Sequence, residues 1–273
     1  MKTLIQITFL SLLFTNIAFA QKVAKEKKYD KVIFNELTQD NENMTIYAVD
    51  AVSTDSYFKF KLRIQNKTKD YLIIDFNKMK IVLNGSNEYK PSEKTLIIPP
   101  GEFGSRVVNF TGTEFRVTQL EIIMDGVKTA STNGKVYEAP NYNLPVSNND
   151  FNTGPFRFLN KSTECKTDIT LVKMEVTYTG TDMAVVQPIK IGLKMPVSGN
   201  VFANMISNKK AILLGPNESA NFNMLWENID VKQNGDMQKV KMEILFKDAF
   251  METKTTDKSG TKFTLTINEK ESK

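Results

Sequence analysis

Residues 57–66 read YFKFKLRIQN, and the alternation in this stretch decides the fold class. From Phe58 to Ile64 every even position is apolar, and every odd position between them is Lys or Arg. A two-residue period is that of a β-strand with one face on a core and the other in water. The stretch therefore predicts a long strand at the surface of a sheet.

The same alternation recurs along the chain, and turn residues separate the runs. Pairs such as Asn84-Gly85 and Asp125-Gly126 are typical of tight connections between antiparallel strands. No long helical pattern interrupts them. We therefore predict an all-β fold with strands that include residues 79–83, 120–124, 189–195, 240–246 and 263–267.

Several landmarks occur twice at a nearly constant offset. Leu96–Glu102 aligns with Ile212–Glu218 at an offset of 116, which also places Phe110 on Trp226. The strand at Phe58 resembles the one at Val172 at an offset of 114. Such a period indicates two copies of one fold. We expect a domain at residues 32–138, a Pro- and Asn-rich linker at 139–150, a second domain at 151–268 and a disordered tail at 269–273.

The first twenty residues have the pattern of a signal peptide. Lys2 provides a positive start, an apolar stretch follows, and Ala18-Phe19-Ala20 has small residues where a signal peptidase cleaves. A membrane anchor is the alternative, although a span needs ~20 predominantly apolar residues. We expect cleavage after Ala20, a periplasmic or secreted protein, and no membrane span in the mature chain.

The positive charge is concentrated near the new N-terminus. The chain carries +5, and loss of Lys2 with the leader leaves +4. Residues 22–31 hold five Lys against Glu26 and Asp30, a net +3, so the rest is about +1. We therefore expect residues 21–31 to be a disordered, solvated lead-in, and we expect no nucleic-acid partner.

The residue inventory excludes most catalytic chemistry. The chain has no His, which removes His-dependent nucleophiles and His-ligated zinc, and it has one Cys, Cys165. No glycine-rich phosphate loop occurs. We predict no catalytic, cofactor-binding or metal-binding residues, and no enzyme activity. Whether Cys165 is free or joins a dimer is left open, as is a site built from carboxylates that converge in space.

Each copy has a long amphipathic strand, a polar turn, and a Pro-Gly-Glu or Pro-Asn-Glu turn before a Phe- or Trp-containing strand. In these features it resembles immunoglobulin-like domains. The resemblance is to those of exported bacterial proteins of unknown function, and it covers most of residues 32–268. It implies two tandem antiparallel β-sandwiches after a cleaved signal peptide. The paired cysteines of antibody domains are missing.

Two classes of function follow from these features. The first is a non-catalytic binding or structural module of the bacterial cell envelope that recognises a protein or glycan partner through sandwich loops, with Asn66, Glu102 and Glu218 as candidate contacts. The second is a carboxylate-only hydrolase of an envelope polymer. A pilus-type periplasmic chaperone is a further alternative, which a long uncapped edge strand would favour. Trp226 is expected in the core rather than on a sugar-binding surface.

Overall fold

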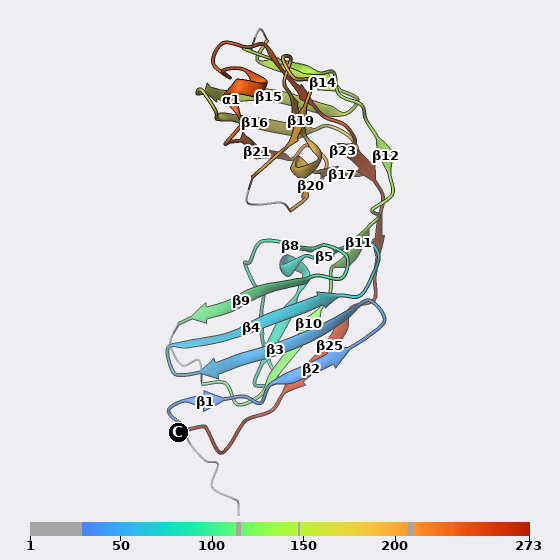
Figure 1. The fold of residues 1–273 in the computed structure, drawn as a ribbon. Helices are drawn as coiled ribbons and strands as arrows, with labels where there is room; N and C mark the ends of the chain where they lie inside the picture. The colour runs from blue at the N-terminus through green and yellow to red at the C-terminus, as the bar shows by residue number, and fades with distance from the viewer. Residues whose placement is uncertain (1–28, 113–115, 147, 207–209) are drawn as a thin grey trace, which may run out of the picture.

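The computed structural model describes residues 29–112, 116–146, 148–206 and 210–273. The fold is all-β, as predicted, and its strands form antiparallel sheets grouped in two lobes (Figure 1). The expected leader and most of the basic lead-in lie outside the described residues. None of the helices in the described part of the chain is long and apolar enough to cross a bilayer.

The first lobe contains the N-terminal strands and also the last two strands of the chain. Its members are β1 (Val32–Ile33), β2 (Leu37–Asp40), β3 (Met44–Ser53), β4 (Tyr57–Asn66), β5 (Tyr71–Ile74), β6 (Lys80–Leu83), β7 (Asn87–Tyr89), β8 (Leu96–Ile98), β9 (Phe103–Thr111), β10 (Leu120–Met124), β11 (Val127–Ala130), β24 (Thr255–Asp257) and β25 (Thr261–Leu265).

This lobe has two layers around one core. The long strands form one sheet in the order β1-β3-β4-β9, with β2 also paired to β3. The opposite layer consists of two short sheets, β24-β11-β5-β8 and β25-β10-β6-β7. The even positions of β4 predicted to be apolar and inward, Phe58 to Ile64, are buried in the core between the layers, as the alternation requires.

The second layer is divided because its strands bend in the middle. A 3-10 turn, η1 (Phe76–Lys78), separates β5 from β6, and the Asp75 carboxylate caps it by accepting from the Asn77 amide. Gly126, at φ +76°, makes the matching bend between β10 and β11. A Cβ there would lie 2.7 Å from Lys78 Cβ, so the close approach of the two bends requires glycine.

The second lobe has the same strand order, without a counterpart of β1. It contains β12 (Lys135–Val136), β13 (Tyr142–Leu144), β14 (Asp150–Thr153), β15 (Phe156–Cys165), β16 (Thr170–Tyr178), β17 (Met183–Val186), η2 (Pro188–Lys190), β18 (Gly192–Lys194), β19 (Val201–Ala203), β20 (Ile212–Leu214), β21 (Ser219–Trp226), α1 (Val231–Asn234), β22 (Met242–Leu245) and β23 (Phe250–Thr253). The sheets are β14-β15-β16-β21, β12-β23-β17-β20 and β13-β22-β18-β19.

The sequence repeat aligns β4 with β16 two residues away from where the backbone hydrogen bonds place them. The Asn66 amide donates to Glu102 O, and the Tyr178 amide donates to Glu218 O. The offset is therefore 112 for β4 and β16 instead of 114, whereas it is 116 for the strand after each turn. A shift of two keeps the same face inward, so side-chain periodicity cannot detect it.

The chain crosses between the lobes twice, and the two crossings pair with each other. After β11, residues 131–134 lead into β12 of the second lobe, which pairs with β23. After β23 the chain returns to the first lobe as β24, which pairs with β11. The Ser131 amide donates to Lys254 O between these pairings, so the crossings run side by side at the waist (Figure 1).

These crossings differ from the expected domain boundaries. Residues 255–268 complete the sheets of the first lobe, because β25 pairs with β10 along its whole length. The expected linker 139–150 contains β13, which pairs with β22 and buries Tyr142 and Leu144. The expected disordered tail is ordered: Lys273 and Lys31 exchange two backbone hydrogen bonds of 2.9 Å.

The lobes also touch through a small apolar cluster at the waist. Tyr71, Ile73 and Ala130 of the first lobe are buried with Val185, Leu213 and Met251 of the second. The Gln187 side-chain amide donates to the Tyr71 hydroxyl at 3.3 Å across the same contact. Apolar burial and backbone pairing thus join the lobes at the same place.

Nicking the first crossing tests this connectivity. A protease site inserted between Thr132 and Asn133 should yield two fragments that remain together in native buffer, because β24 and β25 of the second fragment belong to sheets of the first. Size-exclusion chromatography of the cleaved protein, with and without denaturant, measures this. Fragments that separate without denaturant as two folded pieces would contradict it.

Trp226 tests the core of the second lobe. Its ring is completely buried, as expected, and its indole N–H donates to Phe202 O at 3.0 Å. We expect Trp226→Ala to lower the free energy of unfolding by ~3 to 5 kcal/mol, since it leaves a cavity and an unpaired carbonyl. Equilibrium urea unfolding against wild type measures the loss, and a change below ~1 kcal/mol would be inconsistent with this burial.

Candidate functional site

Asn66, one of the three candidate contacts, is a structural residue. Its side chain is completely buried at the end of β4. The amide nitrogen donates to Asp70 O at 2.7 Å and Ile98 O at 2.9 Å, and the amide oxygen accepts from the Thr68 amide. All its hydrogen-bonding capacity is directed at the turn and at β8. Asn66 is therefore not available to a partner.

Glu102 and Glu218 are exposed, in equivalent turns of the two lobes. The Glu218 carboxylate accepts from the Gly215 amide at 2.7 Å and so fastens its own turn. It also lines a groove of about 480 Å³ between the lobes, together with Lys94 and Lys128. Glu102 is not part of that groove. The structure thus does not bring the three predicted contacts into one site.

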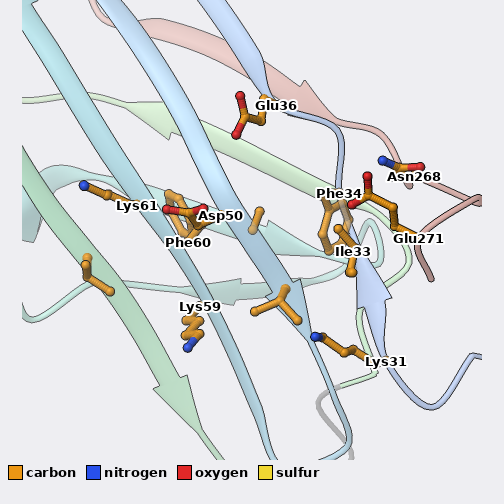
Figure 2. Close-up of a pocket in the computed structure, with 13 residues that line it drawn as sticks. Lys31, Ile33, Phe34, Glu36, Asp50, Lys59, Phe60, Lys61, Asn268 and Glu271 are labelled. Atoms are coloured by element: carbon orange, nitrogen blue, oxygen red, sulfur yellow. The ribbon is translucent and has the colours of Figure 1, made fainter. Parts of the chain in front are cut away.

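A larger hollow lies on the first lobe, at the outer face of its long-stranded sheet. It measures about 640 Å³, and residues from β1, β3, β4, β9 and the C-terminal segment line it (Figure 2). Its position follows from a bulge in β3, where the pairing with β4 shifts between Val49 and Val52. Asp50 adopts φ +55° in this bulge. Bulges bend a strand locally and redirect its side chains.

The lining of the hollow combines charge of both signs with apolar surface. Six charged side chains contribute, and Figure 2 shows them around Phe34 and Phe60: Lys31, Glu36, Asp50, Lys59, Lys61 and Glu271. No ion pair joins any of them to another residue in the described part of the chain. Lys59 lies 5.6 Å from the centre of the Tyr57 ring, a weak cation–π contact. These charges therefore remain available to a ligand.

The two chain ends form one wall of the hollow and hold each other in place. The Ile33 amide donates to the Ser272 hydroxyl at 2.9 Å, and Phe34 forms a β-bridge with Ile267. Sequence reasoning missed this site, because residues 269–273 carry no strand pattern. The signal that was present is the cationic outer side of β4, where Lys59 and Lys61 face away from the core.

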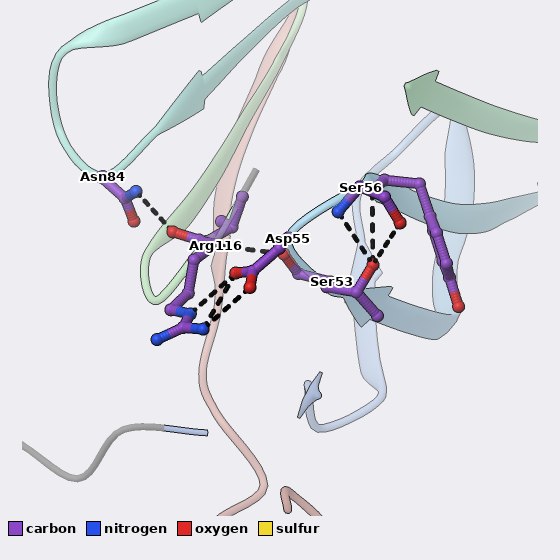
Figure 3. Close-up of polar contacts among 8 residues, drawn as sticks. Ser53, Asp55, Ser56, Asn84 and Arg116 are labelled. Carbon is purple, nitrogen blue, oxygen red and sulfur yellow. Dashed lines mark hydrogen bonds and ion pairs between the residues drawn. The ribbon is translucent and has the colours of Figure 1, made fainter. Parts of the chain in front are cut away.

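A group of polar contacts fastens the loop ends beyond β3. The Arg116 guanidinium donates to both carboxylate oxygens of Asp55 at 3.0 Å, and the Ser53 hydroxyl accepts from the Val117 amide at 3.0 Å (Figure 3). Asn84 accepts from the Thr118 amide at 2.8 Å. These groups are fully engaged with the protein, and an exposed ion pair of this kind stabilises by ~0 to 1 kcal/mol. We assign them a structural role.

A polar cluster at the waist also involves titratable groups. The Glu252 carboxylate accepts from the hydroxyl of Tyr178 and, at 2.8 Å, from that of Tyr137. The Tyr178 hydrogen bond is the main reason that the pKa of Glu252 lies below its usual value. Burial and the neighbouring carboxylate raise the pKa of Tyr178. The cluster ties β16 to β23 and the residues around β12 and leaves no free nucleophile.

No other chemistry is assembled in the described residues. Residues 29–112, 116–146, 148–206 and 210–273 contain no group of three or more His, Cys, Asp or Glu that could hold a metal ion. Cys165 is a free thiol, half-buried at the end of β15. We take the hollow as the candidate site, since it combines a volume of about 640 Å³ with six charged side chains.

The Glu252 cluster predicts a pH dependence of stability. A carboxylate with a lowered pKa stabilises the fold above its unfolded pKa of ~4.3, and this contribution is lost as the pH falls through the folded pKa. Glu252→Gln should therefore unfold at lower urea concentration than wild type at pH 7, with a smaller difference at pH 3. The exposed Glu88→Gln is the control. A difference that does not change with pH would contradict this interpretation.

Comparisons with known proteins add no functional assignment. No family model matches the sequence, and no curated protein matches it. One of the similar solved structures is the crystal structure of red sea bream transglutaminase, 9% identical, with 72% of this chain aligned. The chain covers 27% of that protein, and the TM-score is 0.17. A likeness this low carries no argument about fold or activity.

Proposed function

We propose that this protein is a non-catalytic, exported binding module of the bacterial cell envelope, built from two immunoglobulin-like sandwiches. It recognises a protein or glycan partner with the outer face of its first lobe. The observation that carries the proposal is the hollow of about 640 Å³, whose six charged side chains form no ion pair within the described residues. Sites of this volume, with a few converging polar groups, are typical of ligand recognition.

The position of the hollow supports binding by a pre-formed surface. Its floor is built by β3, β4 and β9, which are paired along their length, and its wall is closed by the paired chain ends. A surface held this way loses little conformational entropy when a partner binds. We therefore assign recognition of the partner to the sheet face and not to the sandwich loops, since Asn66 is buried.

A carboxylate-only hydrolase is the second candidate, favoured by one observation. Glu36, Asp50 and Glu271 line the same hollow, and paired carboxylates can cleave glycosidic bonds without His or metal. Release of reducing ends from envelope polysaccharides by wild type, and its loss in Asp50→Asn and Glu271→Gln, would favour this function over binding.

Binding by the hollow can be measured on arrays of envelope glycans and of peptides. We expect the purified protein to bind members of one class, and Lys59→Ala/Lys61→Ala to weaken that binding about tenfold, which corresponds to ~1.4 kcal/mol. Lys173→Ala, at the position of Lys61 in the second lobe, is the matched control and should bind as wild type does.

The same arrays can reject the proposal. Binding that survives Lys59→Ala/Lys61→Ala but is lost in Glu102→Ala/Glu218→Ala would return the function to the loops. Absence of binding to both classes would reject recognition of a glycan or peptide by this face.

A further inference from the structure

The two lobes differ at the edge of their long-stranded sheets. In the first lobe β9 is the last strand, paired with β4 from Phe103 to Thr111. In the second lobe β21 occupies the same place beside β16. An edge strand presents a row of backbone N–H and C=O groups that can pair with another chain. Such an edge can accept a partner where these backbone groups are not already bonded within the lobe.

The edge of the second lobe is covered at the C-terminal end of β21 by the chain itself. The Asn204 side chain accepts from the Leu225 amide at 2.9 Å, and the Met205 amide donates to Leu225 O at 2.8 Å. The backbone groups of Leu225 therefore point away from β16 and are satisfied locally. The Trp226 indole adds a hydrogen bond to Phe202 O just beyond.

The equivalent backbone groups of the first lobe are open. At the offset of 116, Asn109 corresponds to Leu225 and Val107 to Asn223, so their N–H and C=O groups point away from β4. Ser105 O has the same direction and accepts from the Arg106 guanidinium at 3.1 Å. No described residue bonds to the outward groups of Val107 or Asn109. The outward groups of Asn109 are thus open, whereas those of its counterpart Leu225 are bonded.

The face next to this edge is cationic and partly apolar. The outward residues of β4 are Lys59, Lys61 and Arg63, and the acidic residue that β3, β4 and β9 contribute is Asp50, at the bulge of β3. Phe103 and Val107 expose 42% and 54% of their surface. The Arg63 guanidinium lies 4.2 Å from the centre of the Phe103 ring, which holds it over the sheet.

The corresponding face of the second lobe lacks this charge. On β16 the outward positions alternate in sign, with Lys173 followed by Glu175. Glu175 pairs with Lys161 of the neighbouring strand at 3.3 Å. Open backbone groups at Val107 and Asn109 and a mainly positive face therefore occur together in the first lobe, whereas the second lobe has a face of mixed charge and bonds the outward groups of Leu225.

We propose that β9 binds an extended, acidic segment of a protein partner, which adds to the sheet as a further strand. The proposal rests on the proposed binding function and names its partner class. Backbone pairing with Val107 and Asn109 supplies affinity, and the cations select acidic side chains. The added strand lies two strand spacings, ~10 Å, from β4. Ser105 and Asn109, which lie opposite Arg63 and Lys59 in the register, have short side chains that leave these two cations room to reach across that distance.

A synthetic peptide tests this directly. The probe is a capped, fluorescein-labelled peptide that alternates Glu with Val and Thr, and its counterpart carries Lys in place of Glu. Fluorescence anisotropy with the full-length protein should show saturable binding of the Glu peptide, and at least about tenfold weaker binding of the Lys peptide. Equal binding of both peptides, or no binding of the Glu peptide at low salt, would overturn the proposal.

Variants separate strand addition from charge attraction. Val107→Pro removes an outward N–H that bonds to none of the described residues, a position where an edge strand tolerates proline. It should weaken binding of the Glu peptide about tenfold, as should Lys61→Glu/Arg63→Glu. Lys173→Glu, at the position of Lys61 on the second lobe, should leave it unchanged. Binding that is insensitive to Val107→Pro would overturn strand addition.

Amide hydrogen exchange gives a readout that does not depend on the variants. Strand addition should slow exchange at Val107 and Asn109 when the Glu peptide is bound, whereas contact through side chains alone would leave these amides unprotected and overturn the proposal. The proposed binding function can fail separately. Array ligands whose binding requires Lys59 and Lys61 but is unaffected by Val107→Pro would retain that function and reject the strand.

Discussion

The rest of the structure depends on the antiparallel pairing of the two chain segments that cross the waist. Gly134 lies so close to the second crossing that a Cβ would overlap the carbonyl oxygen of Glu252. The first crossing leads into β12, where the second lobe begins, and the second crossing returns the chain to the first lobe as β24 and β25. Since the first lobe takes its strands from two segments, with the whole second lobe between them in the sequence, the stabilities of the lobes are coupled through this pairing.

The hollow also depends on the pairing of the two crossings. One wall of the hollow is formed by Asn268 and Glu271, which reach the first lobe because the second crossing brings β25 back beside β10. The pairing of Lys31 with Lys273 then closes the sheet next to the bulge in β3. A surface on the first lobe is thus completed by the end of the chain, which follows the second lobe in the sequence.

Sequence periodicity predicted the strands well and their partners poorly, for a physical reason. Alternation at Phe58 to Ile64 reports which side of a strand is buried, and burial of Trp226 was expected from its alignment with Phe110 in the repeat. It does not report which strand lies alongside, so residues 261–265 were assigned to the wrong lobe. Asn66 has the polar character of a contact residue, yet its partners are backbone carbonyls, which sequence does not display. The hollow arises from a bulge and from chain ends that carry no pattern.

The contrast between the two sheet edges suggests why one of them stays open. An uncovered edge favours pairing of identical copies, and proteins commonly suppress this with charge. Two copies that met through β9 would bring Lys61 and Arg63 of each face near those of the other, and like charges repel. An acidic strand, in contrast, is attracted by these cations. The same cations that oppose self-association therefore favour one class of partner, whereas the second lobe, whose face is balanced by Lys161 and Glu175, relies on Asn204 to cover its edge.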